Sequence, residues 1–171
     1  MPHTHEAAVN AKNIYVPMLQ RGLESFMRVF NTRMGNVQIL DVGGKHAALS
    51  IAAQEGFREP FLTAFATVEA NHGTGCGRAL RTGKTVVIAD VETDEEYAPY
   101  RDLARDAGYR AVVSTPIRTK WGHNVGIVST HFESPGAPAP DRIAIGEAIA
   151  RELAHDIVRA MGPDDITRGS W

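Results

Sequence analysis

The residues of this sequence whose types and spacing could do chemistry are gathered in one short stretch, HGTGCGRALRTGKT, at positions 72–85. The stretch contains four glycines, the only cysteine of the chain, Cys76, and a Gly-Lys-Thr end. It could cradle a phosphate, present a reactive thiol, or begin and end a short helix. Each alternative makes a different demand on the spacing of its residues.

The phosphate-binding alternative fails on spacing and on context. A Walker-type loop has a glycine five positions before its Gly-Lys-Ser/Thr, and it opens a helix whose N-terminus faces the phosphates. The residue five positions before Gly83 is Arg78, and Lys84 leads into a predicted strand. The C-terminal end of a helix disfavours anions because of its dipole. Gly83 is therefore interpreted as a helix stop.

The glycines at 73, 75 and 77 leave two interpretations open. They precede the helical segment RALRT, so the backbone amides near Cys76 could face a ligand at a helix N-terminus, where the pKa of a cysteine falls. Alternatively, these glycines only let the loop pass close under a sheet. Free cysteines are commonly small buried hydrophobic residues, and thiol redox catalysis normally needs a second cysteine. We therefore predict that Cys76 is packed rather than reactive.

The seven histidines and an acidic run show no metal-binding or hydrolase motif. No histidines are spaced as H-x-x-x-H or H-E-x-x-H. An EF-hand loop starting at Asp90 would need glycine and glutamate where the chain has Glu95 and Arg101. Ser129 and His131 share a strand face, but no G-x-S-x-G elbow or positioned acid accompanies them. We expect no catalytic residues, no metal and no evident cofactor.

Polar residues interrupt two predicted strands that are otherwise apolar. His131 shares a face with Ser129 on one of them, and Ser114 lies between Val113 and Thr115 on the other, so it faces away from both. Buried polar side chains must bond to the backbone, to buried water or to a ligand. The backbone and a ligand both stay open as partners for these three side chains.

The bulk composition restricts the function classes. A length of 171 residues predicts a single domain. The net charge of −2, with basic residues spread throughout, offers no footprint for nucleic acid. No apolar run approaches the ~18 residues of a membrane span, and the N-terminus lacks the pattern of a signal peptide. A single cysteine excludes an internal disulfide framework. We therefore expect a cytoplasmic protein that uses neither a membrane nor nucleic acid.

The periodicity predicts helices that bracket a mostly antiparallel sheet, a one-domain α+β class. A helix is predicted over about the first thirty residues, with Pro17 in a first turn. A second, amphipathic helix is predicted at 141–160. Its apolar stripe consists of Ile145, Ile149, Leu153 and Ile157. A short helix is predicted at 60–68, and a capping box at Thr93 and Glu96. Strands are predicted at 35–44, with a turn at Gly43-Gly44, and at 45–54, 85–91, 110–119 and 124–132.

These segments, taken in order, resemble a GAF domain of the type common in bacterial sensor histidine kinases. The resemblance rests on GNVQILD, AAQEGF, FLTAFATV, GTGCGRALRTGKTVVIADVETDEEYAPYR, AGYRAVVSTPI and GIVSTHF, and it covers about residues 35–133. It implies a central antiparallel sheet of five to six strands. The N- and C-terminal helices would lie on one face, and short helices and loops on the other would enclose a small-molecule pocket.

The resemblance also implies an organisation of the chain and a set of pocket residues. It divides the chain into an N-terminal helical segment 1–33, a GAF core 34–133, a linker with the C-terminal helix 134–161, and a flexible tail 162–171. The stretch 72–83 and the helix after Asp94 would form the lid of the pocket. The candidate wall residues are Cys76, Tyr97, Tyr100, Arg101, Ser114, Ser129 and His131.

By this resemblance the protein is a sensory module that binds an unknown small-molecule effector. It would form a homodimer through its terminal helices and act on a signalling output protein or domain. One alternative is a thiol-based redox sensor or reductase-like enzyme centred on Cys76, although AGYRAVVSTPI lacks the later cysteines of the similar methionine sulfoxide reductases. A second alternative is a ligand-free dimerisation module that uses helices 17–31 and 141–160.

Overall fold

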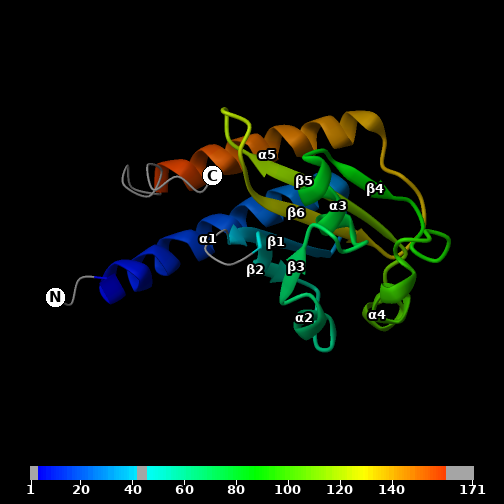
Figure 1. Ribbon diagram of the computed structural model, residues 1–171. Coiled ribbons are helices and arrows are strands. Elements are labelled where there is room, and N and C mark those ends of the chain that lie inside the picture. The colour runs from blue at the N-terminus through cyan, green and yellow to red at the C-terminus, as the bar shows by residue number, and fades with distance from the viewer. Residues whose placement is uncertain (1–3, 42–45, 161–171) are drawn as a thin grey trace.

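The computed structural model describes residues 4–41 and 46–160, with the side chains described from residue 16 onward (Figure 1). Five α-helices, one 3₁₀ helix and six strands follow one another within these ranges. They are α1 (Thr4–Phe30), β1 (Met34–Asp41), β2 (Ala48–Glu55), α2 (Phe61–Ala64), β3 (Thr67–Glu69), α3 (Gly75–Thr82), β4 (Val86–Ile88), η1 (Ala98–Tyr100), α4 (Arg101–Ala107), β5 (Ala111–Arg118), β6 (Asn124–Phe132) and α5 (Pro140–Ala160).

The strands form one antiparallel sheet in the order β3-β2-β1-β6-β5-β4. The hairpin predicted from 110–119 and 124–132 is confirmed as β5 and β6, and Gly122 in its turn has a φ of 87°. The predicted α+β class with an antiparallel sheet is therefore confirmed, and the sheet has six strands.

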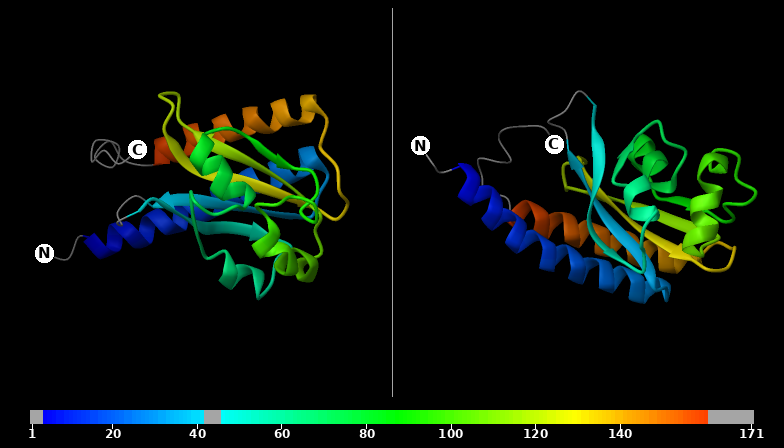
Figure 2. Two further views of the ribbon diagram at one scale, coloured as in Figure 1. Left: turned by 45° about the vertical axis from the view of Figure 1, so that its right-hand side comes forward. Right: turned by 90° about the horizontal axis from the view of Figure 1, so that it is seen from below.

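The two faces of the sheet are covered by different helices (Figure 2). The long terminal helices α1 and α5 lie side by side on one face, and α2, α3 and α4 lie on the other. Because both faces are covered, β5 is buried at every position from Ala111 to Ile117 and β6 at every position from Val125 to His131. Neighbouring residues of these strands consequently enter two different cores.

We call the core between the sheet and the two terminal helices the helix-side core. It is apolar, and α1 and α5 pack closely against each other within it. Leu23 and Phe26 of α1 are fully buried, and Leu153 and Ile157 of α5 are almost so. Gly146 permits the approach of the helices, since a Cβ there would lie 2.8 Å from Cε2 of Phe30. No helix in the described ranges combines the length and the hydrophobicity that crossing a membrane requires.

Several predicted elements have different bounds in the structure. The helix predicted at 60–68 ends at Ala64, because Thr67–Glu69 pairs with β2 as strand β3. The strand predicted at 85–91 is shorter and lies at the edge of the sheet, as β4. Pro17 lies inside α1 rather than in its first turn. The turn predicted at Gly43-Gly44 lies outside the described residues.

Two local predictions were wrong, one at Thr93 and one at Ile145. Thr93 caps no helix, and instead the carboxylate of Asp94 accepts a hydrogen bond from the backbone N–H of Tyr97 at 3.0 Å. Ile145 is 51% exposed, although it was predicted in the apolar stripe of the C-terminal helix. The buried face of α5 is instead formed by Gly146, Ala150, Leu153, Ala154 and Ile157.

Two alanine substitutions on α5 test which face of this helix carries stability. Leu153→Ala removes a buried side chain from the helix-side core, so we expect it to lower the free energy of unfolding by about 2–5 kcal/mol. Ile145→Ala is the matched control on the exposed face and should change that free energy by no more than about 0.5 kcal/mol. Urea denaturation measures both, and equal losses would contradict the assignment of the faces.

Candidate functional site

A row of polar side chains crosses the three central strands on the face that α3 covers. Asn36 of β1 is paired with Ser129 of β6, and Ser129 is paired with Ser114 of β5. Paired residues of antiparallel strands project to the same face, so these three side chains are neighbours. The hydroxyl oxygens of Ser114 and Ser129 are 2.7 Å apart, within hydrogen-bond distance. All three residues are at least 97% buried.

A small cavity lies between this row and the N-terminus of α3. Its volume is about 20 Å³, which is room for about one water molecule. The sheet contributes Asn36 and Gln38 from β1, Val112 and Ser114 from β5, and Ser129 and His131 from β6. The covering segments contribute Phe61, Phe65, Thr74, Gly75, Cys76 and Tyr97. No residue on this lining carries a formal charge when His131 is neutral.

Three polar atoms on the cavity lining are buried without a hydrogen-bond partner. They are Oδ1 of Asn36, Oε1 of Gln38 and Nδ1 of His131. An unsatisfied buried polar group costs about 1–3 kcal/mol. Two amide oxygens accept hydrogen bonds, and a neutral imidazole nitrogen either donates or accepts one. The lining therefore suits a small guest that donates hydrogen bonds.

His131 lies in a nest of aromatic rings. The centroid of its ring is 4.6 Å from that of Tyr109 and 4.9 Å from that of Phe57, with the rings close to perpendicular. Burial in these surroundings lowers the pKa of His131 to about 3, because an imidazolium would lose its hydration there. The imidazole is therefore neutral at physiological pH and adds no charge to the cavity.

The three glycines of the 72–77 segment serve close packing. A Cβ on Gly75 would lie 2.6 Å from Oγ of Ser114, and one on Gly73 or Gly77 would collide with backbone carbonyl oxygens. The N–H of Gly77 is already bonded to Oγ1 of Thr74, the N-cap of α3. Of the two interpretations left open by the sequence, the structure favours the one in which the loop passes close under the sheet. Gly83, with a φ of 65°, ends α3 as predicted.

Cys76 lies on the cavity lining and is partly buried. Its Sγ is 3.3 Å from Oγ1 of Thr74, and the side chain of Gln38 also hydrogen-bonds to it. Burial raises the pKa of the Cys76 thiol, and these hydrogen bonds offset the rise only in part. A raised pKa keeps the sulfur in its less reactive thiol form.

Tyr97 lies on the lining and closes it together with a second tyrosine. The hydroxyl oxygens of Tyr97 and Tyr109 are 2.7 Å apart, and both residues are at least 98% buried. Burial raises the pKa of each phenol, so both remain protonated. The pair joins the loop before η1 to the start of β5.

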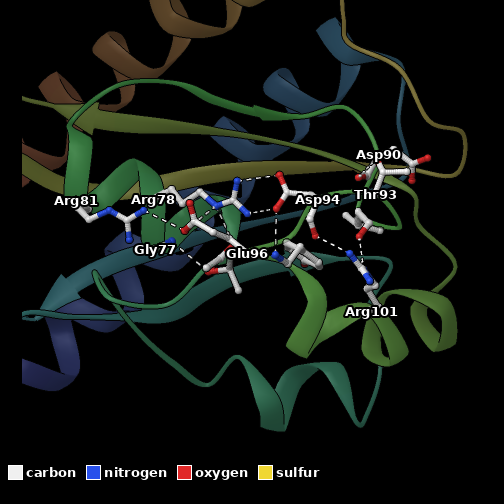
Figure 3. Close-up of polar contacts among 12 residues, drawn as sticks. Gly77, Arg78, Arg81, Asp90, Thr93, Asp94, Glu96 and Arg101 are labelled. Atoms are coloured by element: carbon white, nitrogen blue, oxygen red, sulfur yellow. Dashed lines mark hydrogen bonds and ion pairs between the residues drawn. The ribbon is translucent and has the colours of Figure 1, made fainter.

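An ion-pair clamp holds the loop that carries Tyr97 against α3 (Figure 3). The guanidinium of Arg78 donates to both carboxylate oxygens of Asp94, and its Nε donates to the carbonyl oxygen of Gly73 at 2.9 Å. Asp94 also receives the Tyr97 N–H, so the bonds from Arg78 and Tyr97 hold its pKa below its usual range. Arg81 and Glu96 form a second, more exposed pair at 3.2 Å.

Two of the predicted wall residues, Tyr100 and Arg101, lie outside the lining of this cavity. Arg101 donates hydrogen bonds to the carbonyl oxygens of Val91 and Asp94 at 3.0 and 2.8 Å, so it fixes the loop from outside (Figure 3). The ring of Tyr100 packs on that of Tyr97 at 5.6 Å between centroids and forms an outer layer. The other five, Cys76, Tyr97, Ser114, Ser129 and His131, are brought together on the lining.

The sequence reasoning missed two lining residues on β1. Asn36 and Gln38 alternate with Val37 and Ile39, and this period-two pattern was a signal for a polar face. Within the described residues, no group of three or more His, Cys, Asp or Glu side chains is arranged to hold a metal ion.

The sequence matches a known protein family over most of its length. Residues 17–157 match the family model described as GAF domain. No curated protein matches the sequence significantly. Several solved structures match the fold.

The GAF domain region of a membrane protein from Geobacter sulfurreducens PCA is 18% identical, with a TM-score of 0.73 over 91% of this chain and 99% of that one. A domain of a two-component sensor histidine kinase from Sinorhizobium meliloti 1021 is 17% identical, with a TM-score of 0.67 over 88% of this chain and 95% of that one. A type II free methionine-R-sulfoxide reductase from Thermoplasma acidophilum is 18% identical, with a TM-score of 0.69 over 88% of this chain and 97% of that one.

The burial of neutral His131 predicts a pH dependence of stability. The unfolded chain takes up a proton at this residue below about pH 6.5, whereas the folded protein does so only near pH 3. The free energy of unfolding should therefore fall as the pH decreases from 6.5 to 4.5, by up to about 1.4 kcal/mol per pH unit from this group. Urea denaturation across that range measures the slope.

His131→Phe supplies the control, because it keeps an aromatic ring beside Phe57 and Tyr109 but cannot titrate. The remaining histidines are shared by both proteins, so the difference between the two slopes isolates His131. We expect the variant to show the shallower slope. Parallel curves for the two proteins would show that His131 is protonated normally in the fold.

Proposed function

The chain belongs to the GAF domain family, a family of signalling and sensing modules, and we propose that this member binds a small uncharged polar molecule in the cavity beneath α3. The observation that carries the proposal is the set of three unpaired buried atoms on Asn36, Gln38 and His131. A core selected only for stability would place apolar side chains there, because unpaired polar atoms lower stability.

The chemistry of the lining supports an uncharged guest. A buried ion needs a partner of opposite charge, and the lining offers hydroxyl, amide, thiol and neutral imidazole groups instead. Ureas, small amides and polyols are molecules of the required chemistry, since they donate several hydrogen bonds and carry no charge. A guest larger than water requires the covering segments to move outward, because the cavity measures about 20 Å³.

The central strands offer a path from the cavity to the terminal helices. Ser114 and Ser129 face the cavity, and their neighbours Val113 and Val128 lie in the core that α1 and α5 cover. A guest that shifts these strands would favour one packing of the two helices over another. Allostery requires such a difference in contacts between two states of the protein. The exposed side chains of Val16 on α1 and Ile145 on α5 are available for a homodimer and for contact with an output protein or domain. We place this activity in the cytoplasm.

A ligand-free dimerisation module is the second candidate, and the small volume of the cavity favours it. Thiol chemistry at Cys76 has less support. The structurally similar protein from Thermoplasma acidophilum is a reductase, but the present chain has one cysteine, and burial raises the pKa of its thiol. We therefore propose a regulatory rather than an enzymatic role.

A thermal-shift experiment with a matched variant tests ligand binding. Ureas, small amides and polyols are added to the wild-type protein, where a guest at about 100 times its dissociation constant adds about 2.7 kcal/mol of stability. Gln38→Met keeps the size of the side chain, and it removes one unpaired acceptor together with the hydrogen bond to the Cys76 thiol. We expect it to abolish the response and to change the melting temperature of the ligand-free protein little, because the two losses have opposite effects on stability. The ligand-free candidate gains support if none of these compounds stabilises the wild type and native mass spectrometry finds no bound molecule.

Titration with a thiol reagent tests the enzymatic alternative. Because Cys76 is partly buried and its pKa is raised, we expect the native protein to react far more slowly than the protein unfolded in urea. Mild peroxide should leave the native thiol reduced. Rapid reaction of the native protein, with a rate that stays high below pH 7, would instead indicate an activated thiolate.

A further inference from the structure

A second concave surface lies on the opposite face of the sheet from the cavity and takes no part in the proposed function. It is a cleft of about 920 Å³ between the C-terminal half of α5, the turn of the β5–β6 hairpin and the turn that joins α3 to β4. Basic side chains line it from all three sides. We call it the cationic groove and define it by Lys84, Arg118, Lys120, Arg151, His155 and Arg159.

The wall formed by α5 carries its basic residues in a line. Arg151, His155 and Arg159 are spaced four residues apart, so they project from the same side of the helix. The eight-residue span from the first to the last covers about 12 Å along the axis. Lys84 and Lys120 lie on the other side of the groove, on the two turns. The groove therefore has basic side chains on both of its sides.

Within the described residues, few carboxylates approach the basic side chains of the groove. Among its described lining residues Glu147 is the single acid, and its carboxylate accepts a hydrogen bond of 2.6 Å from the hydroxyl of Thr85. Within the described ranges no ion pair joins a carboxylate to Lys84, Lys120, Arg151 or Arg159.

Arg118 has a different role, because its guanidinium donates to the carbonyl oxygens of Gly83 and Gly122. It thereby ties the two turns of the groove together and holds their shape. The groove is thus a built surface rather than a chance gathering of mobile side chains.

The rim of the groove offers one further contact. Trp121 is 58% exposed there, and Nζ of Lys120 lies 4.8 Å from the centroid of its ring. An exposed tryptophan can anchor an apolar side chain of a partner.

We propose that the cationic groove binds an acidic segment of a partner protein, rich in Asp and Glu and carrying an apolar side chain that packs on Trp121. The charge complementarity supports this assignment, as does the length of the α5 wall, which matches about four residues of extended chain. Nucleic acid is a poorer fit. The chain has 20 Asp and Glu residues against 18 Lys and Arg residues, so its overall charge does not favour a polyanionic backbone. One exposed aromatic ring also makes no stacking platform for successive bases.

Fluorescence anisotropy with the full chain tests the proposal. The probe is a labelled ten-residue peptide of glutamates with a central leucine, and its comparisons are the same peptide with glutamine for glutamate and a ten-residue oligothymidylate. We expect the glutamate peptide to bind most tightly at low salt and to weaken as salt is added. Equal or tighter binding of the glutamine peptide or of the oligothymidylate would overturn the proposal.

Charge-reversed variants locate the binding surface. Arg151→Glu with Arg159→Glu should weaken binding of the glutamate peptide at least about tenfold. Lys84→Glu with Lys120→Glu, on the opposite side, should have a similar effect. Arg21→Glu with Arg28→Glu alters two exposed residues of α1 and matches the change in net charge, so it should leave binding within about twofold. Circular dichroism confirms folding, and wild-type affinity in both groove variants would overturn the proposal.

Discussion

The burial of the central strands on both faces is the constraint on which the rest of this structure depends. A strand alternates its side chains between two faces, so a strand covered on both sides must supply two cores at once. In β6, Val128 enters the apolar core beneath α1 and α5, and its neighbour Ser129 enters the polar row beneath α3. Both cores are largely apolar, and on the α3 side the polar row lies beside a hydrophobic cluster that includes Phe61, Val68 and Ile127.

The α3 side of the sheet is covered by a second apolar cluster, and backbone contacts and ion pairs add to this cover around the cavity. The glycines of the 72–77 segment let α3 approach until Gly75 is in contact with Ser114. Arg78 and Asp94 then clamp the following loop, which places Tyr97 over the cavity. Ion pairs of this kind contribute modestly to stability. Apolar side chains of this cluster must therefore separate before a guest larger than water can enter the cavity.

The sequence was sufficient to predict the antiparallel sheet, the hairpin of β5 and β6 and the helix stop at Gly83. These features depend on local patterns of alternation and turn residues. Five of the seven side chains that the resemblance suggested for a pocket wall, Cys76, Tyr97, Ser114, Ser129 and His131, lie together on the lining of the cavity. The exposure of Ile145 could not be predicted from helical spacing, which places apolar residues on a stripe but does not say which edge of the stripe meets the neighbouring helix. The outward position of Arg101 depends on two backbone carbonyl groups that only the folded loop brings together.

A high-resolution crystal structure of the purified protein tests the central claim most directly, because it shows what contacts the polar atoms of the cavity. Our account predicts electron density for a small uncharged molecule, or for an ordered water in its place, within hydrogen-bond distance of Oδ1 of Asn36, Oε1 of Gln38 and Nδ1 of His131. The account would be contradicted if these atoms were found hydrogen-bonded to one another or to the backbone in a dry, fully packed core.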